Sequence, residues 1–189
     1  MVVDEAVATT LRARPQAQVA TFVASCAERM VQIFTGLCGG DPARGGDVDF
    51  VVGTMADLWR SDIPVDRFRS GVATLDGFPE LAPDEEFTGV ADIYAFYSVL
   101  VLRYAALYRS GADTEDALKC AHASLTAMAQ LDQNLPGAEF FAQEAESQQR
   151  ALSAPPLGDS NTVPLSQLME NDRVVSRERL AALHSRFAS

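Results

Sequence analysis

Apolar residues recur at steps of three and four along nearly the whole chain, which is the spacing of a helix that buries one face. Apolar stripes with this spacing run through residues 19–37, 47–59, 113–133 and 138–152, and a shorter one runs through 65–75. No segment shows the alternation of a half-buried strand. The sequence therefore predicts an all-α, single-domain bundle of about six helices. In residues 19–37 the stripe consists of Val19, Phe22, Cys26, Met30, Ile33 and Leu37.

Residues 89–108 form the most apolar segment, GVADIYAFYSVLVLRYAALY. A segment of this length is also long enough to span a membrane. Asp92 and Arg103 argue against a span, because both charges are costly in hydrocarbon. We expect instead the central, buried helix of the bundle and no membrane. Each charge then needs a partner from another helix or access to solvent, and the natural candidate pairs are Glu28 with Arg103 or Arg29 with Asp92.

Residues 22–34, FVASCAERMVQIF, interrupt an apolar run with two charges. At about 100° per residue, Glu28 points about 200° away from Cys26, and Arg29 lies on the flank of the apolar stripe. We predict that Glu28 and Arg29 form the solvated side of a core-packing helix, where they tie it to the central one.

The character of the chain changes after Leu152. Residues 153–164, SAPPLGDSNTVP, are rich in proline, serine and glycine, as linkers are, and an amphipathic segment follows. We predict a helical-bundle domain of residues 1–152 and an extension of residues 153–189, made of a linker and a tail helix. Helix-in-groove docking suits such a tail, so we expect it to bind a protein partner or a second copy, giving a homodimer. Its apolar residues are Leu165, Leu168, Met169, Leu180, Leu183 and Phe187.

The phrase SCAERM at residues 25–30 resembles the first long helix of the YjaG-like family, a bacterial domain of unknown function. In that family a Gly-Asp turn and a helix ending in tryptophan follow, and Gly40-Asp41 and Trp59 fit this order. The phrase EFFAQEAESQQRAL at 139–152 resembles the closing helix, so the resemblance covers roughly residues 16–152. It implies an all-helical bundle and brings no established activity.

The net charge of −11 disfavours nucleic acid and anionic membranes as partners, because their phosphates repel an acidic surface. Such a surface suits a basic protein, although solubility alone also explains it. All basic residues except Lys119 are arginines, a bias typical of a GC-rich bacterial genome. One hypothesis is therefore an acidic protein of the immunity or antitoxin type, which neutralises a basic partner.

Three cysteines without a CxxC spacing indicate free thiols and a reducing compartment. The first sixteen residues lack the long apolar core of a signal peptide. The sequence thus predicts a cytoplasmic protein.

Candidate catalytic groups are few. The two histidines, His122 and His184, begin no metal-binding pattern, and no glycine-rich phosphate loop is present. We therefore expect no metal, no cofactor and no catalytic residue, and we favour a protein–protein interaction or regulatory module over an enzyme. The alternative is a small-ligand binder or enzyme with a pocket near Asp92 and Arg103. Candidate binding residues are Glu28, Arg29, Asp92 and Arg103.

Overall fold

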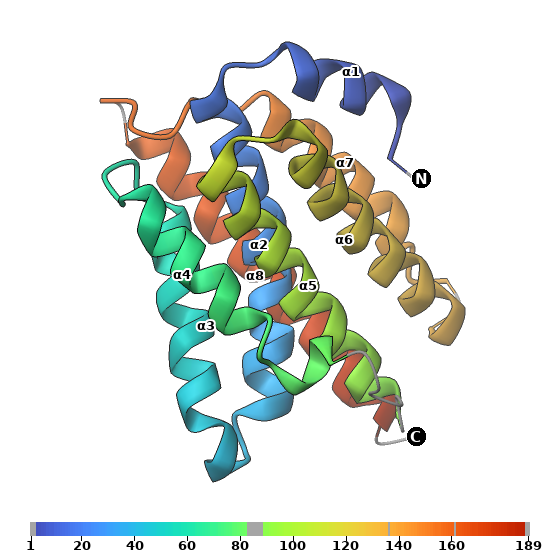
Figure 1. Cartoon of the computed structure of the whole chain (residues 1–189). Helices are drawn as coiled ribbons and strands as arrows, with labels where there is room; N and C mark the ends of the chain where they lie inside the picture. The colour runs from blue at the N-terminus through green and yellow to red at the C-terminus, as the bar shows by residue number, and fades with distance from the viewer. Residues whose placement is uncertain (1–2, 83–88, 136, 161, 188–189) are drawn as a thin grey trace.

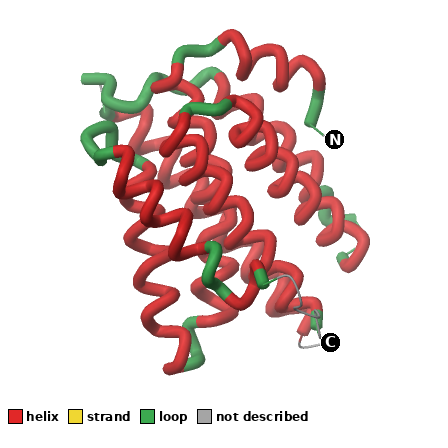
Figure 2. The backbone as a smooth tube through the Cα atoms, viewed as in Figure 1, coloured by secondary structure: helices red, strands yellow, loops and turns green. Residues whose placement is uncertain are grey.

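The computed structural model describes residues 3–82, 89–135, 137–160 and 162–187. This part of the chain contains eight α-helices, two short 3-10 turns and no strand (Figures 1 and 2). The predicted all-α class is confirmed, and the predicted count of about six helices is too low. The helices are α1 (Glu5–Ala13), α2 (Gln16–Cys38), α3 (Gly45–Leu58), α4 (Val65–Leu75), α5 (Val90–Gly111), α6 (Thr114–Asn134), α7 (Phe140–Leu152) and α8 (Val163–Phe187).

Helix α2 is the most enclosed element of the bundle. It packs against α3, α5, α6, α7 and α8, and every residue from Val19 to Val31 is buried. Figure 1 shows α2, α5 and α8 in the middle, with α3 and α4 on one side and α6 and α7 on the other. The prediction that Glu28 and Arg29 are solvated is therefore wrong, because neighbouring helices cover α2 on every side of this run.

Helix α5 is a second core helix, as the sequence predicts. It packs against α2, α4 and α6 within the bundle. Among the described residues, it is the one helix whose length and composition would also allow a membrane span. Core helices pass the same test, so these two properties alone do not distinguish the two environments.

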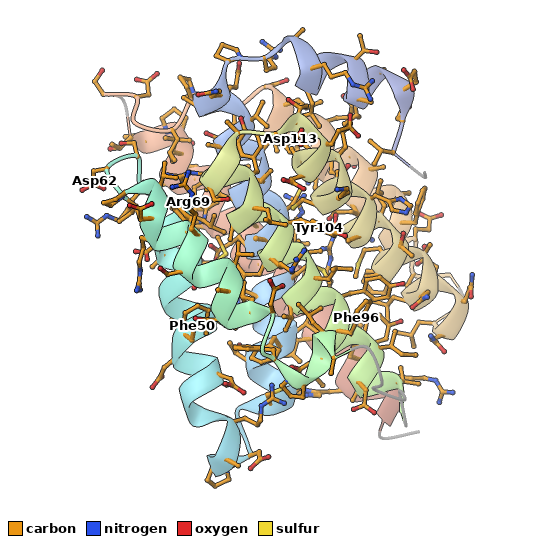
Figure 3. The ribbon with its side chains drawn as sticks, in the orientation of Figure 1. Phe50, Asp62, Arg69, Phe96, Tyr104 and Asp113 are labelled. Carbon is orange, nitrogen blue, oxygen red and sulfur yellow. The ribbon has the colours of Figure 1, made fainter. Side chains whose placement is uncertain are left out.

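Aspartate side chains cap the N-terminal ends of several helices, because their oxygens satisfy backbone N–H groups that lack a partner within the helix. Asp4 accepts from the N–H of Ala6 at the start of α1. Asp113 accepts from the N–H of Glu115 at the start of α6, and Figure 3 labels it there. Asp132 of α6 caps the next helix, since its two oxygens accept from the backbone N–H groups of residues 140 and 141 at 2.6 and 2.9 Å.

The segment before α8 is fastened to the first turns of α2. Leu157 donates its backbone N–H to the carbonyl of Ala17 at 2.9 Å. The Thr21 hydroxyl donates to the carbonyl of Pro155, also at 2.9 Å. These bonds hold the proline-rich segment 153–160 against the bundle and direct the chain into α8.

Helix α8 itself packs along α2. It buries two charged groups, a hydroxyl and a leucine, so residues after the predicted boundary at 152 contribute to the common core. Their spacing of four, three and four residues places them on one face. They are Asp172, Ser176, Arg179 and Leu183.

Gly158, in the segment that precedes α8, packs closely against Ser61, and its replacement tests this contact. Its φ is +88°, and a Cβ atom there would lie 2.9 Å from the Ser61 hydroxyl oxygen. Gly158→Ala is therefore expected to lower the free energy of unfolding by about 1–3 kcal/mol, measured by urea denaturation. Gly46→Ala is the control, because it lies in the first turn of α3 with open space around it. Equal stabilities of the two variants would contradict the close approach.

Candidate functional site

Arg29 lies at the centre of a buried ionic network that joins three helices. Its guanidinium donates to both carboxylate oxygens of Glu144 on α7, each at 2.8 Å. It also donates to Asp172 on α8 at 2.9 Å. Arg179 of α8 reaches the same Glu144 carboxylate at 2.6 Å. Two positive and two negative charges therefore balance within the core.

Neutral side chains complete the network. Ser124 and Gln148 donate to Glu144 at 3.0 and 2.9 Å, and Ser25 donates to Asp172 at 2.6 Å. Burial alone would raise the pKa of the Glu144 carboxyl, but Arg29 and Arg179 outweigh it and hold that pKa far below its usual range. The side chain of Arg29 is 0 % exposed. The network therefore connects α2, α6, α7 and α8, and presents no charged group to a ligand.

Burial dominates the environments of Cys38 and Cys120. Cys26 and Cys120 are fully buried, and burial raises the pKa of Cys120 well above its ordinary value. Burial likewise raises the pKa of Cys38 to about 11. Since the thiolate is the reactive form, these environments favour structural cysteines.

Glu28 faces a different side of α2 from Arg29. Its carboxylate accepts a hydrogen bond from the indole N–H of Trp59 at 2.7 Å and one from Nε of Arg173 at 3.0 Å. Burial raises the pKa of Glu28, and the two donors offset part of this effect. Glu28 therefore bridges the end of α3 and the middle of α8 across the surface of α2.

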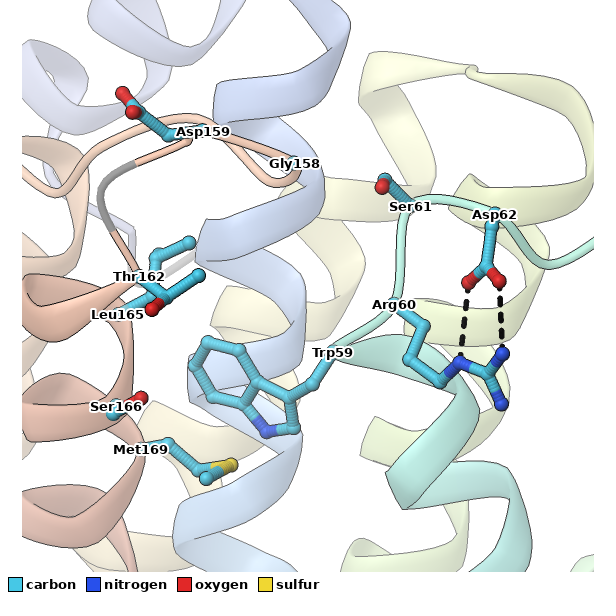
Figure 4. Close-up of a pocket in the computed structure, with 10 residues that line it drawn as sticks. All are labelled: Trp59, Arg60, Ser61, Asp62, Gly158, Asp159, Thr162, Leu165, Ser166 and Met169. Carbon is cyan, nitrogen blue, oxygen red and sulfur yellow. Dashed lines mark hydrogen bonds and ion pairs between the residues drawn. The ribbon is translucent and has the colours of Figure 1, made fainter.

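A cavity of about 350 Å³ lies on one side of this bridge. Figure 4 shows the indole ring of Trp59 facing Ser166 and Met169 of α8 and Thr162, which directly precedes that helix. Leu165 adds apolar surface, and the acidic residues of the lining are Asp62 and Asp159.

A second cavity, of about 230 Å³, adjoins the same bridge and is lined by both Glu28 and Arg173. Its α3 wall consists of Val52, Met55 and Ala56, and Val52 is 52 % exposed. We call the two cavities together the α3/α8 groove. Its walls follow helical spacing: Val52, Met55, Ala56 and Trp59 from α3, and Leu165, Ser166, Met169 and Arg173 from α8, with Glu28 of α2 on the floor.

Asp92 and Arg103, the other two predicted site residues, are not brought together. Asp92 accepts from the backbone N–H of Gly89 at 3.0 Å at the start of α5 and lines a cavity of about 150 Å³. Arg103 pairs with Asp76 instead. The predicted pairs Glu28–Arg103 and Arg29–Asp92 are therefore wrong, because α3, α7 and α8 supply nearer partners for the charges of α2.

Sequence reasoning missed Trp59 and Arg173 as partners of Glu28, and it missed Glu144 and Asp172 as partners of Arg29. A usable signal was present in the tail, where Asp172, Ser176 and Arg179 fall on one face. Polar residues at the inward spacing of an amphipathic helix indicate a buried charge that another helix must match.

No family model, curated protein or solved structure matches the chain. The resemblance to the YjaG-like family therefore stays a prediction. Within the residues that the structure describes, no three histidine, cysteine or carboxylate side chains gather as metal ligands would.

Trp59 is the only tryptophan in the sequence, so its fluorescence reports directly on the groove. Because the pKa of Glu28 is raised, we expect an emission change as this carboxylate is protonated, with a midpoint above about 4.3, the ordinary value for glutamate. The step should disappear in Glu28→Gln. A wild-type titration that is flat above that pH, or an unchanged step in the variant, would contradict the assignment.

Proposed function

We propose that the chain is a protein-binding module whose α3/α8 groove receives an amphipathic helix of a basic partner protein. The observation that carries this proposal is the pair of apolar cavities on either side of the Glu28 bridge. Val52 on α3 and Trp59, directly after its last residue, are seven residues apart and are separated by about 10 Å along the helix axis at 1.5 Å per residue. Two apolar side chains about two turns apart on a docked helix would reach both cavities.

The charges around the groove support a basic partner. Asp62 and Asp159 line the larger cavity. The arginines nearby already have carboxylate partners, since Arg60 pairs with Asp62 and Arg173 with Glu28. Over both cavities the three carboxylates of Glu28, Asp62 and Asp159 outnumber the two arginines by one charge, in a chain whose net charge is −11. Opposite charges on a basic partner would therefore favour encounter and orientation.

A comparison of two exposed valines tests the proposal. Val52 lies in the groove, whereas Val65 begins α4, and they are 52 % and 44 % exposed. Val52→Glu should abolish capture of the partner from native cells, because it would place a carboxylate in the apolar cavity beside Glu28. Val65→Glu adds the same charge elsewhere and should retain the partner. Equal capture by both variants would contradict binding in the groove.

A small-ligand binder is the second candidate, and one observation favours it. The cavity beside Trp59, at about 350 Å³, falls within the range of small-molecule sites, roughly 300–1,000 Å³. Mass spectrometry of the purified protein under non-denaturing conditions would separate the two functions. A bound small molecule that Trp59→Ala releases would favour this candidate over the helix.

A further inference from the structure

We infer that the α3/α8 groove selects a helix with an arginine or lysine between two apolar anchors, and that this side chain replaces Arg173 as the partner of Glu28. The inference rests on the proposed function, because it specifies the partner of the same groove. It follows from the position of the Glu28 carboxylate and from the difference in flexibility between its two donors, Trp59 and Arg173.

The Glu28 carboxylate lies on the floor of the groove between the two cavities. Its side chain is 4 % exposed while Arg173 covers it. Trp59 forms one wall and donates from its indole N–H, on a rigid side chain with two rotatable bonds. Of the two donors, Arg173 has the long flexible side chain, which is 40 % exposed and donates to Glu28 from Nε. Arg173 is therefore the donor that an incoming cation would displace.

A second carboxylate is ready to receive the displaced arginine. Glu170 lies one turn earlier on α8, and its carboxylate is 3.8 Å from Nη1 of Arg173. Arg173 therefore stays next to a negative charge after it leaves Glu28. Before the exchange Arg173 pairs with both Glu28 and Glu170, and Arg177 also pairs with Glu170. Afterwards Arg173 keeps its pair with Glu170 and the incoming cation takes its place at Glu28, so the number of ion pairs is unchanged.

Docking would make the new pair stronger than the old one. A partly exposed ion pair contributes little, because water screens both charges. A cation carried in by a helix would meet Glu28 beneath that helix, where water is excluded and charge-assisted hydrogen bonds strengthen. An acidic side chain at the same position would be repelled by Glu28, so the groove discriminates by charge at its centre.

The cavities on either side set the register of the recognised segment. Apolar anchors that enter the two cavities lie about two turns apart, and the central residue lies one turn from each. The expected pattern is therefore apolar, basic, apolar at steps of three or four residues along one face of the helix.

A displayed library of 16-residue helical peptides, randomised on one face, tests this pattern against the full chain. The wild-type protein should enrich arginine or lysine between two apolar residues, and Glu28→Gln should lose the basic preference. For a selected peptide, titrated against Trp59 fluorescence, Glu28→Gln should weaken the Kd at least tenfold. Arg173→Ala should bind at least as tightly as the wild type, and Glu178→Gln, an exposed change on α8, should leave the Kd unchanged. Circular dichroism checks that each variant is folded.

Each outcome has a separate meaning. The selected peptides could lack a basic central residue while Val52→Glu still abolishes their enrichment. That result would support the groove as the binding site and contradict the proposed charge selection. Arg173→Ala weakening the Kd as much as Glu28→Gln would overturn the exchange, because Arg173 would then contact the peptide. If no peptide is enriched, the proposed function itself is contradicted.

Discussion

Glu144→Gln is expected to lower the free energy of unfolding by about 3–5 kcal/mol, the range for breaking a buried ion pair. The Glu144 carboxylate accepts from Arg29, Arg179, Ser124 and Gln148, all of them buried. An amide would present two N–H donors where five hydrogen bonds now converge. It would also leave the two guanidiniums with Asp172 as the one carboxylate of the network.

Urea denaturation of Glu144→Gln beside Glu146→Gln checks this expectation. Glu146 lies on the same helix but is exposed, so its replacement should change stability by less than about 0.5 kcal/mol. A loss below about 1 kcal/mol for Glu144→Gln would contradict the role of the network as the main polar link between α2, α7 and α8.

The difference in unfolding free energy between the wild type and Glu144→Gln is expected to depend on pH. The pKa of Glu144 is lower in the folded chain than in the unfolded chain. Its ionisation therefore stabilises the wild type above the unfolded value of about 4.3, and this contribution is lost as the pH falls further. The stability gap between the wild type and Glu144→Gln should accordingly narrow below about pH 4.

Deletion of residues 163–189 is expected to abolish cooperative unfolding. The deletion removes α8, and with it the buried residues Asp172, Arg179 and Leu183. It also uncovers the face of α2 that α8 packs against. The shortened chain should keep helical circular dichroism but lose the near-ultraviolet signal of fixed aromatic packing and bind a hydrophobic dye.

Val174→Ser is the matched control within α8, because Val174 is 40 % exposed. It should melt cooperatively at a temperature close to that of the wild type. A shortened chain that also melts cooperatively near the wild-type temperature would show that α8 is an independent extension. In that case the sequence-based division at residue 152 would describe the protein better than a single bundle does.

Periodicity predicted most of the fold, because an amphipathic helix has the same spacing of apolar residues whichever element it packs against. The all-α class and the core position of α5 both follow from local patterns. Helix α1 was missed because its nine residues carry only a short stripe. The burial of α2 on every side was missed for a different reason. Its polar residues are neutralised by other helices, and a single-helix pattern does not contain that information.

The candidate site could be predicted only in part. Glu28 and Arg29 stand out as charges within an apolar run, and both make specific contacts in the structure. Their partners could not be predicted, since Glu144 and Arg173 lie 115 and 145 residues further along the chain. Trp59 has the pattern of an ordinary apolar position, so its hydrogen bond to Glu28 depends on how α3 crosses α2. Spacing along one helix says nothing about such crossings.

Site-specific photo-crosslinking in native cells tests the central claim of a helix-binding groove most directly. A photoreactive amino acid replaces Val52 in the groove or, as the matched control, Val65 on α4. We expect one discrete protein adduct from position 52 and none from position 65, with the crosslinked peptide carrying a basic residue between apolar ones. Adducts of equal yield from both positions, or no protein adduct from position 52, would contradict the claim.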